Sequence, residues 1–128
     1  NQDKKNLLLS RGKTSFYILN KYPYSVGHLM IAPNEHKGDI HELSKDEMLD
    51  LMTMAGKAQK VLADEMKPDG FNIGANIGKA AGAGIVGHFH LHIVPRWNGD
   101  ANFMPVISDT KVISQSLDDI YDFLKSKF

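Results

Sequence analysis

The chain has 128 residues, which is enough for one domain with a real core but not comfortably for two. Its 15 basic residues balance its 15 acidic residues, so no basic excess argues for nucleic-acid binding. The absence of cysteine excludes disulfides, thiol catalysis and cysteine-ligated zinc within this sequence, and no apolar run approaches the roughly 20 residues that cross a membrane. We expect a single domain over residues 1–128 with a cytoplasmic location, since no secretory signal is visible.

Three short strands are predicted in the first third of the chain, where aliphatic, aromatic and β-branched residues are bounded by turn residues. They cover residues 7–9, 14–20 and 26–32. A turn over residues 21–25 separates the second strand from the third, and Pro33-Asn34 ends the third.

A helix is predicted from Ser44 to the residue before Pro68. Ser44 and Glu47 have the spacing of a capping box, in which each side chain bonds the backbone N–H of the other residue. Apolar residues then recur at helical spacing and are expected to face the core: Met48, Leu51, Met52, Ala55, Ala58, Leu62 and Met66. The methionines, including Met54, are interpreted as core filling.

The second half of the chain is predicted to contain a fourth strand over residues 71–77, a glycine-rich loop and a fifth strand over residues 88–95. A final helix is predicted to begin at Ser116, with Asp119 completing its cap. The predicted elements are strands in hairpins with two inserted helices, which indicates the α+β class.

Three histidines alternate with apolar residues in His88-Phe89-His90-Leu91-His92-Ile93. Strict alternation predicts a half-buried strand with the histidines on one face and the apolar side chains packed on the other. Three interpretations remain open at this point. The row could be a wet surface, a zinc site completed by a ligand such as His28, His36 or His41, or a centre of covalent catalysis in which a neutral imidazole attacks phosphorus.

The segment before the histidines, residues 74–87, is rich in glycine and small residues. Such a backbone can approach a ligand closely and offer N–H groups to anionic oxygens, although a flexible hairpin connection would have the same composition. Residues 82–87 match a dinucleotide-binding fingerprint literally, but that motif opens a helix and this segment leads into a strand.

At these residues the chain resembles the histidine triad family of nucleotide hydrolases and transferases. The likeness rests on the run from His88 to Val94 with Pro95-Arg96-Trp97 after it, and on the run from Gly27 to Pro33. Residues 99–105 are similar to the branch of dinucleoside polyphosphate hydrolases and phosphorylases. The resemblance covers residues 7–106 and implies a histidine triad fold, with an antiparallel sheet of about five strands and two helices. It also implies a homodimer that shares one continuous sheet.

The resemblance implies a role for each matching residue. His90 would be the nucleophile, His92 would contact the phosphate or the leaving oxygen, and His88 would orient His90, partly through its backbone carbonyl. His28 would support the row from another strand. The residues implied to touch substrate are Asn20 at the ribose, Ile18 at the base, and Asn76, Gly82, Ala83 and Gly84 at the phosphate. No metal is required, although a divalent cation can accompany a polyphosphate substrate.

The expected function is cleavage of a dinucleoside polyphosphate, of the diadenosine type, through a nucleotidyl-histidine intermediate. The alternatives are a nucleoside phosphoramidase of the same family, a zinc-dependent hydrolase or lyase, and a noncatalytic nucleotide sensor. The expected partners are an adenine nucleotide and a second copy of the chain, and neither nucleic acid nor a membrane. The chain departs from the family in two places, since Ala83-Gly84-Ile85 replaces the usual Gln and Ser or Thr, and an N-terminal cysteine pair for zinc is lacking.

Overall fold

The fold is known from a computed structural model that describes residues 2–21, 26–83, 87–100 and 110–128, apart from the side chains of residues 110–116. A five-stranded antiparallel sheet has the order β1-β2-β3-β5-β4. The strands are β1 (Leu8–Arg11), β2 (Ser15–Leu19), β3 (Leu29–Pro33), β4 (Gly70–Gly74) and β5 (Leu91–Arg96). The helical elements are α1 (Gln2–Lys5), η1 (Ile40–Glu42), α2 (Lys45–Met66), η2 (Lys79–Ala81) and α4 (Thr110–Lys125). The predicted α+β class and antiparallel sheet are confirmed.

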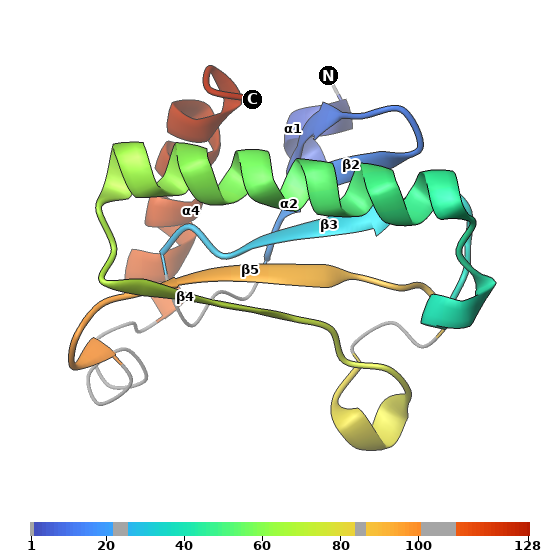
Figure 1. The fold of residues 1–128 in the computed structure, drawn as a ribbon. Coiled ribbons are helices and arrows are strands. Elements are labelled where there is room, and N and C mark those ends of the chain that lie inside the picture. The colour runs from blue at the N-terminus through green and yellow to red at the C-terminus, as the bar shows by residue number, and fades with distance from the viewer. Residues whose placement is uncertain (1, 22–25, 84–86, 101–109) are drawn as a thin grey trace.

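Helix α2 runs along one face of the sheet (Figure 1). It begins with the predicted capping box, because Glu47 N donates to Ser44 Oγ at 3.1 Å and Ser44 N donates to a Glu47 carboxylate oxygen at 2.8 Å. It ends at Lys67, whose φ of 50° places this residue in the left-handed region directly before Pro68. Both predicted ends of this helix are therefore confirmed.

The core lies between α2 and the sheet. The apolar α2 side chains that reach it are Leu51, Met54, Ala55, Ala58 and Leu62. The expectation that Met48 and Met52 would also be core residues is wrong, since these side chains are 38% and 64% exposed. Each lies one residue beyond the centre of the buried stripe, which rotates it by about 100° around the helix axis.

Helix α4 closes one edge of the sheet. Tyr121 and Leu124 are buried in the core, while Tyr121 Oη donates to the carbonyl of Leu8 at 2.8 Å and Lys125 Nζ donates to that of Leu9 at 2.7 Å. The prediction that this helix begins at Ser116 is wrong, because it begins at Thr110. The added turn contains Thr, Val and Ile, which are poor helix formers, so the sequence alone did not mark it.

Several strand ends differ from those predicted. β3 begins at Leu29 and not at residue 26, because Gly27 has a φ of 81° and lies in a turn. β4 ends at Gly74 and not at residue 77, and the short helix α1 had no signal in the sequence. Of the predicted turn over residues 21–25, residues 22–25 lie outside the described residues. Among the helices of the described ranges, none combines the length and apolar content needed to span a membrane.

Candidate functional site

The histidine row lies at the start of β5. Only His92 belongs to the strand, so the prediction of one strand over residues 88–95 is wrong at its N-terminal end. The ladders explain this, because β3 pairs no further than Leu91 and β4 no further than His92. The predicted alternation nevertheless persists, since Phe89 and Ile93 are buried in the core and the rings of His88 and His90 lie 5.3 Å apart.

Asn20, His28 and His92 form a hydrogen-bonded chain across three strand ends. Asn20 Nδ2 lies 2.9 Å from His28 Nδ1, and His28 Nε2 lies 2.9 Å from His92 Nδ1. An amide nitrogen only donates, so His28 accepts at Nδ1 and donates from Nε2. His92 then accepts at Nδ1 and carries its own proton at Nε2.

His28, His90 and His92 are held in the neutral state. Burial, with the charge of His92 as a smaller cause, lowers the pKa of His28 to about 4. Burial also lowers the pKa of His92 and of His90, and His88 and His92 lower that of His90 further. A hydrogen bond from His90 to the backbone of His88 opposes this shift and occupies one ring N–H, which leaves the other ring nitrogen with a lone pair.

Folding stability is expected to fall as the pH drops from 6.5 towards 4. Unfolded His28 takes up a proton below its ordinary pKa of 6.5, whereas folded His28 stays neutral to about pH 4. The unfolded state therefore binds more protons in this window, and each pH unit lowers the free energy of unfolding by up to roughly 1.4 kcal/mol. Urea unfolding across this window measures the slope. His28→Gln keeps an acceptor for Asn20 and should flatten the slope, so an unchanged slope in this variant would contradict the assignment.

His88 is held by two contacts, one from the last residue of β3 and one from the segment after it. Its Nε2 donates to the carbonyl of Pro33 at 2.9 Å, so its Nδ1 accepts from His36 Nδ1 at 3.1 Å. The rings of His36 and His88 are edge-on, with centroids 4.9 Å apart. His36, which the sequence offered as a possible zinc ligand, is exposed, and its contact with His88 had no signal in the sequence.

A cavity of about 510 Å³ opens beside His92. Its described lining residues are Asn20, His28, Asn72, Ile73, Gly74, Ala75, Asn76, His92 and Val94. The structure thus brings together the predicted Asn20, His28, Asn76 and His92, and adds Asn72. His90 and Ile18 do not line it, although strand register places Ile18 in one row with Met30 and His92 on the same face of the sheet.

The glycine loop is folded around η2. Gly82 N donates to the carbonyl of Lys79 at 3.0 Å, and Ala83 N donates to that of Gly78 at 3.2 Å. Two of the amides predicted to hold phosphate therefore already have acceptors within the turn, and Gly84 lies outside the described residues. Glycine is required at positions 78 and 82, where φ is 83° and 93°.

The histidine rings associate in pairs, His28 with His92 and His36 with His88. Within residues 2–21, 26–83, 87–100 and 110–128, no three His, Cys, Asp or Glu side chains are grouped as metal ligands. The exposed His41 lies in η1. The zinc interpretation therefore finds no third ligand in the part of the chain that the structure describes.

The chain is similar in sequence to known proteins. The HIT domain family model matches residues 1–99. The AP-4-A phosphorylase of Mycobacterium tuberculosis is 40% identical over 126 residues, which are 98% of this chain and 65% of that protein. The adenosine 5'-monophosphoramidase of Schizosaccharomyces pombe is 32% identical over 90 residues, 70% of this chain and 64% of that protein.

The same fold is found among solved structures. The diadenosine triphosphate hydrolase of Plasmodium falciparum, in complex with cyclomarin A, has a TM-score of 0.74 at 23% identity, covering 97% of this chain and 80% of that one. The chain spans just under two thirds of the length of the two relatives compared by sequence, at 65% and 64%.

Proposed function

The chain belongs to the HIT domain family, and from that premise we propose that it cleaves dinucleoside polyphosphates at the α-phosphorus through a nucleotidyl-histidine intermediate. The observation that carries the proposal is the chain of neutral groups from Asn20 through His28 to His92, which ends beside the cavity, two residues along the chain from the half-buried His90. Such an arrangement supplies a nucleophile and a hydrogen-bond donor without a metal ion.

In the first step, the unprotonated ring nitrogen of His90 attacks the α-phosphorus. A nitrogen–phosphorus bond forms and the bond from phosphorus to the bridging oxygen breaks, so the remaining polyphosphate leaves. His92 lines the cavity and carries its proton at Nε2, so it can donate a hydrogen bond to the leaving oxygen, which departs as an ionised phosphate and needs no proton. The hydrogen bond from His90 to the His88 backbone favours the positive charge that develops on the attacking ring.

In the second step, an acceptor oxygen attacks the nucleotidyl-histidine and breaks the nitrogen–phosphorus bond. Water as the acceptor releases a nucleoside monophosphate, and inorganic phosphate releases a nucleoside diphosphate. His90 returns to its neutral state, so one residue serves both half-reactions. The sequence departure at residues 83–85 lies in the loop expected to contact the phosphates, and it bears on which acceptor is used.

The proposed substrate is a diadenosine polyphosphate. The support is the 40% identity to a protein named AP-4-A phosphorylase, which extends over 98% of this chain. The amide of Asn20 bonds His28, and we assign its side chain to the ribose hydroxyls as well. Asn76 and Asn72 are assigned to the phosphates, because both line the cavity that His92 borders.

Product analysis tests the proposal. The protein is incubated with diadenosine tri- and tetraphosphate and with an adenylyl amide, each with and without inorganic phosphate. Hydrolysis of the tetraphosphate gives AMP and ATP, whereas phosphorolysis gives ADP and ATP. Release of AMP from the amide alone would instead favour the phosphoramidase alternative, for which the Schizosaccharomyces pombe relative provides the support.

Two further outcomes would reject the proposal. Nucleotide binding without any turnover would identify a sensor, and activity abolished by chelators would identify a zinc enzyme once a cation carried by the substrate is accounted for. In the covalent mechanism, chelators leave turnover of the adenylyl amide unchanged, because the attacking group is the His90 ring and no metal ion takes part in the step.

We also propose that the protein is a homodimer paired along β4. β4 is an edge strand, and the exposed side chain of Ile73 lies on it. The opposite edge, β1, is covered by α4. An exposed edge with an apolar side chain favours pairing with another strand. Because β4 also lines the cavity, a second copy would border the site, and sedimentation should give twice the chain mass of 14.2 kDa.

A further inference from the structure

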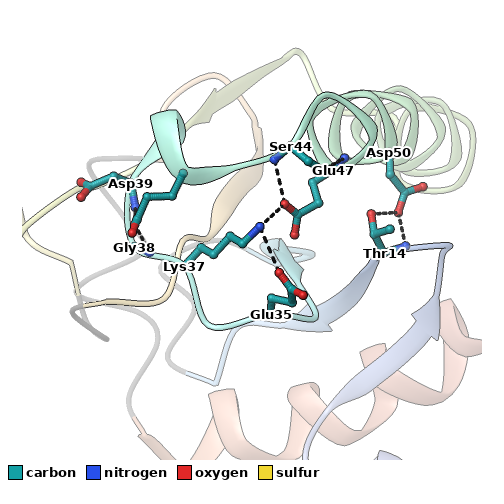
Figure 2. A network of polar contacts seen from close by, with 9 residues as sticks. Thr14, Glu35, Lys37, Gly38, Asp39, Ser44, Glu47 and Asp50 are labelled. Carbon is teal, nitrogen blue, oxygen red and sulfur yellow. Dashed lines mark hydrogen bonds and ion pairs between the residues drawn. The ribbon is translucent and has the colours of Figure 1, made fainter.

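A partly buried ion pair joins the segment after β3 to the start of α2. Lys37 Nζ lies 2.7 Å from a Glu47 carboxylate oxygen whose side chain is only 7% exposed, and 3.0 Å from the exposed Glu35 (Figure 2). The same Glu47 oxygen accepts the backbone N–H of Ser44. Glu47 therefore does more than cap its helix, because it also fixes the position of Lys37.

The backbone of Lys37 reaches the histidine row. Its carbonyl accepts the N–H of Phe89 at 2.6 Å, between His88 and His90. The Phe89 ring is buried in the core, so its amide and its ring are both fixed. Because side chains alternate along an extended backbone, fixing Phe89 determines where the two flanking imidazoles point.

The rest of the segment packs tightly against the same residues. A side chain at Gly38 would come within 2.8 Å of the Gly87 backbone, so these two glycines allow the chains to touch. A carboxylate oxygen of Glu42 accepts the N–H groups of Gly38 and Asp39 at 3.1 and 3.0 Å. The segment is therefore tied to α2, to η1 and to the histidine row.

We propose that Lys37 and Glu47 are positioning residues for the reaction: their partly buried ion pair holds the Lys37 carbonyl against Phe89 and so aligns His88 and His90. This rests on the proposed function, because it assigns His90 as the nucleophile. Neither residue touches the substrate in this account. They act through the backbone over a contact between segments more than fifty residues apart in the sequence.

The test replaces the pair with neutral residues of similar shape. Lys37→Met should lower kcat at least tenfold while KM changes less than threefold, because the substrate pocket is retained but the nucleophile is misaligned. Glu47→Gln keeps the capping interaction and should have the same effect. Lys37→Arg restores the charge and should return kcat to within threefold of the wild type. Hydrogen exchange of the Phe89 amide should accelerate at least tenfold in the first two variants only.

Control variants separate positioning from loss of fold. Glu35→Gln removes the exposed partner of the same ammonium group and should leave kcat and Phe89 exchange unchanged. If Lys37→Met fails to fold because Glu47 is left buried without a partner, Lys37→Met/Glu47→Gln removes both charges and should show the loss of kcat of a single variant. Unchanged kcat in the folded variants, unchanged Phe89 exchange, or an equal loss in Glu35→Gln would overturn the proposal.

Failure of the proposed function would be recognised separately. It would appear as a wild-type protein that turns over no substrate. In that case hydrogen exchange of the Phe89 amide and the NMR chemical shifts of the His90 ring nitrogens still test the positioning role of Lys37. Changes in both upon Lys37→Met support that role, and unchanged values overturn it.

Discussion

Replacement of His90 by alanine is expected to lower kcat by about 10⁴-fold on the best substrate, because the account assigns both half-reactions to this ring. His90 is half-buried, neutral at pH 7 and bonded through one ring nitrogen to the His88 backbone. Among the described histidines, His90 alone combines a ring N–H bonded to the His88 backbone with a second ring nitrogen that can attack the phosphorus. Steady-state assays, with nucleotide binding measured by calorimetry, would separate lost chemistry from lost affinity.

His41→Ala is the matched control for this substitution. His41 is exposed in η1 and belongs to neither pair of rings, and its loss should change kcat less than twofold. A His90→Ala protein that folds normally and retains wild-type turnover would show that another group attacks the phosphorus. Loss of nucleotide binding together with turnover would assign His90 to binding and not to chemistry.

The second large effect is expected on stability. Ile93 follows His92 in β5, is fully buried, and pairs with Leu29 on β3 and with Ile73 on β4. Ile93→Ala should lower the free energy of unfolding by roughly 2–5 kcal/mol, because it leaves a cavity between α2 and the centre of the sheet. Denaturant unfolding measures this loss, which is a large share of the roughly 5–15 kcal/mol typical of a domain.

Met52→Ala is the matched control, on the exposed face of α2. Met52 is 64% exposed although the helical pattern predicted it for the core, so its removal should cost less than about 0.5 kcal/mol. A loss as large as that of Ile93→Ala would mean that Met52 is covered in solution and that the buried stripe of α2 is wider than the structure shows.

Local signals predicted the parts of this fold that depend on near neighbours. The capping box of Ser44 and Glu47 lies within one helical turn, and the left-handed cap at Lys67 precedes a proline that cannot continue the helix. Alternation in the histidine row correctly divided Phe89 and Ile93 from the polar face. Such patterns need no knowledge of what packs against them.

The strand and helix ends that were wrong depend on distant partners. β5 begins at Leu91 because the β3 ladder stops at Leu91 and the β4 ladder at His92, and neither ladder has a signal within the row. Met48 and Met52 were misplaced because apolar spacing defines a stripe only to within about one residue, and the position of the sheet decides which edge is covered.

In the candidate site too, some residues were predicted from the sequence and others were found only in the structure. The family resemblance selected Asn20, His28, Asn76 and His92, and the structure brings these four to one cavity. The contact of His36 with His88 and the bond from Phe89 to Lys37 join segments far apart in the chain, so no spacing rule reaches them. The glycine content of the loop indicated backbone amides available to phosphate. It could not show that the amides of Gly82 and Ala83 already donate to carbonyls within the turn.

Detection of the covalent intermediate tests directly whether the His90 ring attacks the phosphorus. The protein is mixed with a diadenosine polyphosphate, quenched within milliseconds at alkaline pH, which preserves a bond between phosphorus and a histidine nitrogen, and digested for mass spectrometry. The account predicts one adenylyl group on the peptide that contains His90, formed before the products of the second step and absent from His90→Ala. An adenylyl group on another residue, or full turnover with no adduct at any time, would contradict it.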